Sequence, residues 1–252
     1  MSRIPILSRP PRGLILVRAG VVAAALLLAV SGPAAAVGPM SDAMWAHFPG
    51  ANGLDTTGTM GNVRAGFSPG YNVYSTNASS ARVAMGTSYA QNDAIWWMAG
   101  HGAAGLIQTY NSTNGTTNVW VSNTSANCAS PNTCLTLYTS TQMHRIRLAV
   151  FMGCDTGDPN GSGDTLQKRM YSNLGADSAI AFTKTIGFST YTSDYFVTQF
   201  AYYTMVQHYN INDGAWSAAN DVATLNGGNY NGYDGLTFYG GSVKLYPAAF
   251  GS

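Results

Sequence analysis

The chain has 252 residues, with 12 lysines and arginines against 11 acidic residues, all of them aspartate. This length suffices for one medium-sized domain or two small ones, and the near-neutral charge excludes a strongly basic nucleic-acid-binding protein. Charged residues make up only 9% of the chain, so asparagine, serine, threonine, glycine and tyrosine must form most of the folded surface.

The first 36 residues are organised like a secretory signal peptide. Four arginines precede a ten-residue apolar run, Val21–Val30, and small residues up to Ala36 follow it. We therefore expect a signal peptide over 1–36 that is cleaved after Ala36. A membrane anchor is the alternative, but a helix that spans a bilayer needs about 20 apolar residues, more than this run has. No later segment is long and apolar enough either, so we expect a protein secreted to the extracellular space or the periplasm.

Cleavage changes the charge of the protein. The four arginines leave with the peptide, so eight basic residues remain against 11 aspartates, a net charge of −3. With no basic patch left, we expect no nucleic-acid partner, and we expect no membrane partner after cleavage.

The rest of the chain divides by composition into two parts. Residues 37–89 are rich in glycine and asparagine, and we expect them to be irregular or part of the domain that follows. Up to residue 68 we expect irregular chain or a short strand, and Tyr71–Tyr74 should be a strand. Residues 90–252 should form one domain. Its predicted strands are Asp93–Gly100, Val119–Val121, Arg147–Met152 and Ser178–Phe182, its predicted helices are Gly163–Leu174, Thr192–Tyr209 and Asp213–Leu225, and Leu236–Leu245 should be a terminal strand or hairpin.

Two of the apolar runs stop abruptly at a reactive residue. The first ends at Gly100-His101-Gly102, and the second ends at Gly153-Cys154. Short apolar runs of bulky residues are typical of buried strands in a parallel sheet, and reactive groups gather beyond the carboxyl ends of such strands. Residues 147–182 read as strand, helix and strand, a unit whose strands are parallel. The sequence therefore predicts an α/β fold with a mainly parallel sheet, and a histidine and a cysteine at one edge of it.

The three cysteines differ in their surroundings. Cys128 and Cys134 lie in a turn-prone loop, and in an oxidising compartment they can form a disulfide. Cys154 is then left without a partner. An odd cysteine in an exported protein is either buried and inert or a reactive thiol, and the strand-end position of Cys154 favours the reactive thiol.

A histidine beside a thiol supports nucleophilic catalysis. His101 can accept the thiol proton of Cys154 and later return it to the leaving amine, and the backbone amides of Gly102 and Cys154 can face a developing oxyanion. His47, His144 and His208 are the other candidate bases, but none follows the carboxyl end of a predicted strand.

The two segments resemble the caspase-like cysteine peptidases, a group that includes caspases, legumains, gingipains, separases and bacterial CHAT domains. Met152–Gly157 is similar to the Ala-Cys-x-Thr-Gly signature of CHAT domains, and 175–181 is similar to their next helix end and strand. Phe238–Pro247 is similar to a tail of gingipain-like proteins, with Gly241-Ser242 in place of an Asp-Pro pair. The resemblance covers about residues 90–246. It implies a three-layer α/β/α domain and supports the oxyanion role of the Gly102 and Cys154 amides.

The predicted function is that of a secreted cysteine peptidase, which forms a thioester between Cys154 and a peptide or protein substrate. No cofactor is needed, and no His, Cys and Asp spacing indicates a metal site. Asp155 could line the substrate pocket and select a basic residue; otherwise it forms a turn, as Asp158 and Asp164 are expected to do. A non-catalytic binding module with the same fold, and a transpeptidase or amidase with the same dyad, are the alternatives. The oligomeric state stays open.

Overall fold

The computed structural model of the chain comprises two compact units, Met1–Val37 and Gly38–Ser252. The residues it describes are 41–46, 54, 56–76, 93–111, 118–125 and 128–246, all in the second unit. The predicted signal peptide over 1–36 and His47 lie outside these ranges. Within them, no helix has both the length and the apolar character that crossing a membrane requires.

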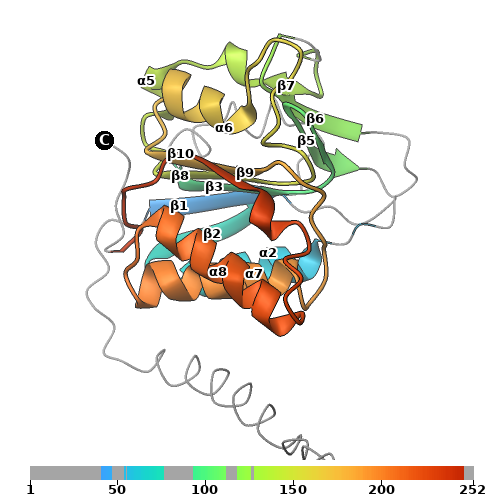
Figure 1. Ribbon diagram of the computed structural model, residues 1–252. Coiled ribbons are helices and arrows are strands. Elements are labelled where there is room, and N and C mark those ends of the chain that lie inside the picture. Colours follow the sequence, from blue (N-terminus) through green and yellow to red (C-terminus); the bar gives the residue numbers. More distant parts are fainter. Residues whose placement is uncertain are drawn as a thin grey trace, which may run out of the picture. The chain divides into compact units, whose positions relative to one another are not determined.

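A six-stranded sheet with the order β10-β9-β8-β3-β1-β2 forms the centre of the second unit (Figure 1). All neighbouring strands are parallel except β10, which runs antiparallel to β9. The α/β class and the mainly parallel character of this sheet therefore agree with the prediction. The strands are β1 (Ser41–Ala46), β2 (Tyr71–Thr76), β3 (Asp93–Ala99), β8 (Leu148–Met152), β9 (Ser178–Phe182) and β10 (Leu236–Gly240).

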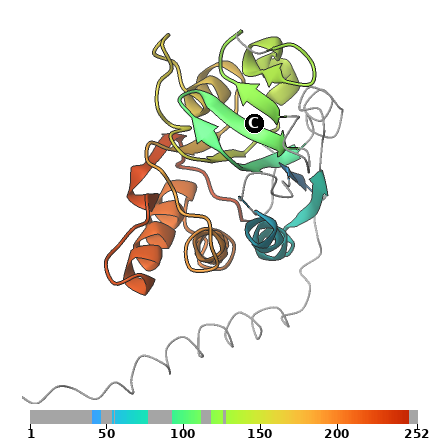
Figure 2. The same ribbon diagram turned by 90° about the vertical axis from the view of Figure 1, so that its right-hand side faces the viewer.

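Three helices cover one face of the sheet (Figure 1). They are α2 (Thr57–Phe67), α7 (Ser193–Ala201), which continues as a π-helical turn over Tyr202–Val206, and α8 (Ile211–Leu225). Figure 2 views α2 and α7 end-on, side by side. Trp97 of β3 packs between them, with ring centroids 5.9 Å from Phe67 and 5.7 Å from Phe200. These aromatic contacts fix the helical layer on the sheet.

The opposite face carries short helices and a small second sheet. Trp96 lies on this face, so the two adjacent tryptophans point to opposite sides, as the strand period requires. Helices therefore lie on both faces of the main sheet. The elements here are α5 (Ser140–Met143), α6 (Leu166–Lys168) with its continuation Arg169–Asn173, the 3-10 turn Leu135–Leu137, and the sheet β4-β5-β6-β7, formed by Gly102–Ala103, Leu106–Asn111, Asn118–Ser122 and Thr133–Cys134.

The expectation of irregular chain up to residue 68 is wrong. Thr57–Phe67 is a helix despite its three glycines. The short strand allowed in this region is β1, and the strand predicted at Tyr71–Tyr74 is confirmed as β2, which extends to Thr76. Glycine disfavours helix, but Met60, Val63 and Phe67 are buried on one side of α2. Gly66 lies so close to Ala201 that a side chain there would collide with it. Packing against α7 therefore overrides local propensity.

The predicted helices lie in the right places with different bounds. The first begins at Leu166 rather than Gly163, because the Thr165 side chain accepts a hydrogen bond from the Lys168 amide and caps it there. The last begins at Ile211 rather than Asp213, because the Asn210 side chain accepts from the Asp213 amide at 2.9 Å. The long predicted helix over 192–209 ends its α-helical part at Ala201.

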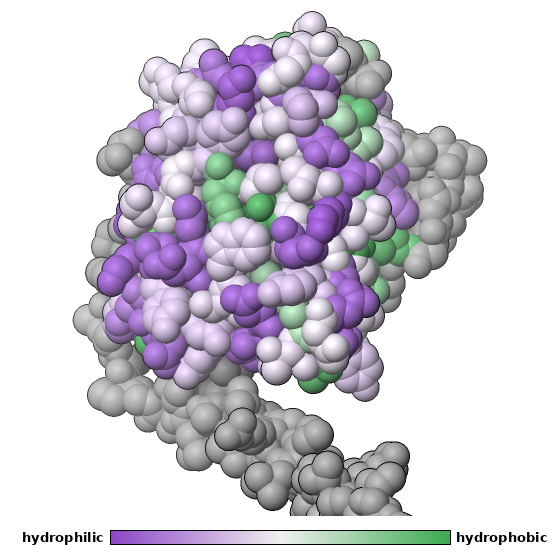
Figure 3. All heavy atoms as spheres, viewed as in Figure 1, coloured by the Kyte–Doolittle hydropathy of each residue, from purple (hydrophilic) through white to green (hydrophobic). Residues whose placement is uncertain are grey.

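The surface is as polar as the composition predicts. The face in Figure 3 is mostly hydrophilic or neutral, with a small hydrophobic patch near its centre. Trp216 is 40% exposed, and its ring packs against that of Phe238 with centroids 6.1 Å apart.

Candidate functional site

The carboxyl ends of β3 and β8 lie side by side. The two strands are parallel neighbours, with Ala99 opposite Met152, and the Gly100 amide donates a hydrogen bond to the Met152 carbonyl at 3.1 Å. His101 and Cys154 each come two residues after this pair, with one glycine between strand and reactive residue in both cases. The structure therefore brings both predicted residues to the same edge of the sheet.

The turn after β8 is held by the side chain of Thr156. Its hydroxyl lies 2.7 Å from the Phe151 carbonyl and accepts a hydrogen bond from the Phe182 amide at 3.3 Å. The Gly157 amide then donates to the Phe182 carbonyl at 2.8 Å. The pairing with β9 thus continues after β8 has ended, while Cys154 and the next residue loop out of the sheet. This explains why threonine and glycine follow the cysteine at this spacing.

Cys154 lies at the tip of this turn and has no disulfide. It is half-buried, packs against the apolar layer formed with α2, α7 and α8, and its Sγ lies 3.9 Å from the Ile186 carbonyl. Asp155 adopts the left-handed conformation, with φ of 56°, and its amide donates to the Lys184 carbonyl at 3.4 Å. Aspartate is among the few residues besides glycine that adopt this conformation readily, so Asp155 suits the turn that carries the cysteine.

Gly102 lies in close contact with the backbone of the turn that carries Cys154. A Cβ on Gly102 would lie 2.9 Å from the Cys154 amide nitrogen and 2.6 Å from Thr156 Cγ2, and it would collide with the Cys154 carbonyl. Only glycine fits this approach. The two residues predicted to donate to an oxyanion are therefore immediate neighbours.

His101 has an exposed side chain on a fixed backbone. Its carbonyl accepts from the Gln108 amide at 2.8 Å, and Gly102–Ala103 then pairs with β5. The imidazole is accessible to solvent and to a ligand at this edge.

The other described histidines lie elsewhere. His144 ends α5 on the amino side of β8, and its Nδ1 contacts the Thr141 carbonyl at 2.7 Å. His208 stacks on Tyr246 with ring centroids 4.3 Å apart. Neither follows the carboxyl end of a strand, so among the histidines that the structure describes His101 is the one that the fold offers to Cys154. The expectation that no other histidine follows a strand is wrong for His47, which comes next after β1 in the sequence and lies outside the described residues.

A polar network behind the thiol was not predicted from the sequence. Tyr233 is fully buried, and its hydroxyl donates to the Gly187 carbonyl at 3.1 Å. Its pKa is raised well above the usual value, by burial first and then by the nearby charges of Asp194 and Cys154, while a hydrogen bond with Ser193 opposes the shift. The Ser193 hydroxyl in turn lies 2.9 Å from the Thr59 hydroxyl, although 134 residues separate the two in the chain. No sequence spacing could have revealed this network.

The remaining predicted residues have structural contacts. Asp164 pairs with Arg169 at 3.0 Å and with Lys168 at 3.8 Å, so it supports the start of α6. The Asp158 amide donates to the Asp155 carbonyl within the turn. No group of three His, Cys, Asp or Glu side chains in the described ranges could hold a metal ion.

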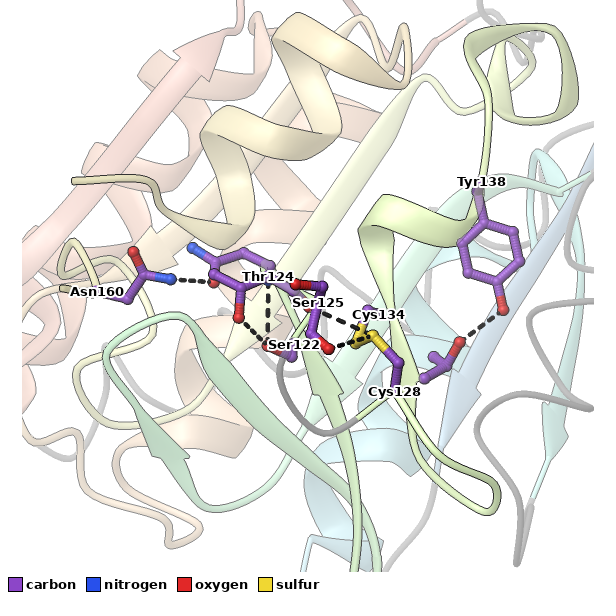
Figure 4. Close-up of a disulfide and its surroundings, with 9 residues drawn as sticks. Ser122, Thr124, Ser125, Cys128, Cys134, Tyr138 and Asn160 are labelled. Atoms are coloured by element: carbon purple, nitrogen blue, oxygen red, sulfur yellow. Dashed lines mark hydrogen bonds between the residues drawn. A yellow bond between two sulfur atoms is a disulfide. The ribbon is translucent and has the colours of Figure 1, made fainter. Parts of the chain in front are cut away.

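Cys128 and Cys134 are joined by a disulfide that closes the loop before β7 (Figure 4). The Cys128 sulfur also lies 3.1 Å from the Ser125 carbonyl. On the same side, Asn160 donates to the Asn123 side chain at 2.7 Å, which ties the small sheet to the loop that follows the cysteine turn. The disulfide thus joins the loop to β7 of the small sheet.

No protein-family model matches this chain, and no curated protein matches it. Its function is therefore argued from the arrangement of its residues.

Proposed function

We propose that this chain is a secreted cysteine peptidase of the caspase-like group, with Cys154 as nucleophile and His101 as general base. The observation that carries the proposal is the placement of both residues directly after neighbouring parallel strands, at one sheet edge. Reacting groups gather at this edge of α/β sheets.

The reaction follows from these residues. His101 takes the proton of the Cys154 thiol, and the thiolate attacks the carbonyl carbon of a peptide bond. The negative charge that develops on the carbonyl oxygen faces the amides of Gly102 and Cys154, an interaction worth about 3–4 kcal/mol for each donor in comparable enzymes. His101 then protonates the leaving amine, a thioester remains on Cys154, and water hydrolyses it to a carboxylate and the free thiol. Transfer to an amine instead of water would make the enzyme a transpeptidase.

Secretion forms part of the proposal. The predicted signal peptide over 1–36 directs export, and the Cys128–Cys134 disulfide is the kind of bond that persists in oxidising compartments.

The test is hydrolysis of a broad library of fluorogenic peptides by the purified protein without residues 1–36. We expect turnover by the native chain and by His208→Ala, and none by Cys154→Ala or His101→Ala, with all variants showing the same thermal unfolding. His208 is the matched control, because its imidazole is also exposed but lies away from the thiol. Hydrolysis that survives Cys154→Ala, or a native chain that hydrolyses no peptide and does not transfer the acyl group to added amines, would overturn the proposal.

A further inference from the structure

The segment Ile186–Asp194, called the wall below, runs from the carbonyl nearest to the thiol to the first turn of α7. Ile186 contributes the carbonyl nearest to the Cys154 sulfur, and the Gly187 carbonyl is fixed by the buried Tyr233 hydroxyl. The segment follows β9 and ends in the first turn of α7, so it lies at the same carboxyl edge as the dyad. A substrate whose carbonyl carbon is bound at Cys154 therefore has its neighbouring groups at the sheet edge along which this wall runs.

Asp194 is the acidic residue of this wall. Its Oδ1 accepts a hydrogen bond from the Thr59 hydroxyl at 2.7 Å, and the Ser193 hydroxyl lies 3.4 Å away. Its Oδ2 reaches the first turn of α2, where a Cβ on Gly58 would stand 2.5 Å from it. α2 follows β1, so this carboxylate also lies at the carboxyl edge of the sheet, between the starts of two helices.

No lysine or arginine in the described part of the chain pairs with Asp194. The four ion pairs there engage Asp164, Asp177 and Asp234. A carboxylate has about four lone-pair sites, and hydroxyl groups from two residues leave acceptor capacity unused. A half-buried carboxylate that lacks a cation is stabilised when one arrives.

We propose that Asp194 is a specificity-determining residue that binds a positively charged side chain, arginine or lysine, of the residue whose carbonyl Cys154 attacks. This inference rests on the proposed function of the dyad. The Thr192 hydroxyl, two residues before Asp194, donates to the Gly187 carbonyl at 2.9 Å, and this carbonyl also accepts from the Tyr233 hydroxyl. Gly187 directly follows Ile186, whose carbonyl lies 3.9 Å from the Cys154 sulfur, so these bonds join the start of α7 to the site. Asp155 is the rival acid, but its left-handed backbone and its place in the turn serve the position of the cysteine.

The experiment compares the rates at which Cys154 is alkylated by two peptidyl chloromethyl ketones and by iodoacetamide. One ketone carries arginine next to the reactive carbon, and the other carries norleucine, which is neutral and of similar length. We expect the native chain to react about tenfold or more faster with the arginyl ketone, the gain typical of one charge-assisted hydrogen bond. Asp194→Asn should remove most of this preference and leave the norleucyl and iodoacetamide rates unchanged. Asp155→Asn is the matched control and should keep the preference.

Gly58→Ala provides a second route to the same result. Its added methyl group displaces the Asp194 carboxylate without changing its charge, so the preference for arginine should fall there as well. If Asp194→Asn does not fold, this variant tests whether Asp194 binds the positively charged side chain.

The outcomes separate the two proposals. Equal rates with both ketones in the native chain, or a preference that survives both Asp194→Asn and Gly58→Ala, would overturn the role of Asp194 and leave the dyad standing. A preference lost in Asp155→Asn alone would assign it to that residue instead. Iodoacetamide labelling that does not depend on His101 would overturn the dyad itself.

Discussion

Replacing Thr156 with valine should weaken the whole turn that carries Cys154. The two side chains have nearly the same shape, so the change removes a hydroxyl group from a fully buried position without leaving a cavity. The hydroxyl lies 2.7 Å from the Phe151 carbonyl and 2.9 Å from the Gly153 carbonyl, and it accepts from the Phe182 amide. Valine leaves that buried amide without a partner, a loss of about 2 kcal/mol.

The loss is measured as the free energy of unfolding in urea, followed by the fluorescence of the buried tryptophans. Thr224→Val is the matched control, because the Thr224 hydroxyl bonds to the Asn220 carbonyl on the exposed side of α8. We expect less than about 0.5 kcal/mol there, the usual range for surface substitutions. Because the turn loosens, Thr156→Val should also hydrolyse peptides more slowly under conditions where it is fully folded. Equal stability of the two variants would refute the assignment of Thr156 as the residue that holds the cysteine turn.

Three further changes test other parts of the structure. Gly102→Ala should abolish peptide hydrolysis because its methyl group meets the Cys154 backbone, whereas Gly161→Ala, where a Cβ meets nothing within 4 Å, should keep it; equal activity would contradict the close approach. Gly61→Ala in α2 should raise the free energy of unfolding by about 1 kcal/mol, because alanine favours helix over glycine. Gly66→Ala should lower it by about 1–3 kcal/mol, because the added methyl group overpacks against Ala201. If both variants changed the free energy of unfolding in the same direction, the packing of α2 on α7 would be contradicted. Reducing the Cys128–Cys134 bridge, which spans a sequence separation of 6, should lower the free energy of unfolding by about 2 kcal/mol. In the unreduced protein, mass spectrometry should detect Cys154 as the one free thiol.

The buried strands were the most predictable part of the fold. β3, β8 and β9 are apolar runs apart from Asp93 and Ser178 at the starts of β3 and β9, and each lies within one residue of its predicted bounds, because burial on both faces favours apolar residues. The reactive residues at two of these strand ends followed from the same runs.

The remaining elements depend on contacts that sequence patterns do not carry. β4 and β7 have two residues each, too few for any periodicity, and α2 is helical only because Gly66 lets it approach α7. The polar network of Thr59, Ser193 and Tyr233 comes from three distant segments and forms only when the sheet brings their ends together. The sequence therefore did not indicate Asp194 as a substrate-binding residue, whereas it indicated Asp155 because that residue is next to the cysteine.

The central claim is that His101 activates Cys154, and the alkylation rate of that thiol by iodoacetamide at pH 7 tests it most directly. The measurement compares the folded native chain with His101→Ala and with His208→Ala, and mass spectrometry locates the label. The account predicts that the rate falls at least about tenfold in His101→Ala and stays unchanged in His208→Ala, since only the thiolate reacts. Equal rates in all three proteins would show that Cys154 is not activated by this histidine and would contradict the account.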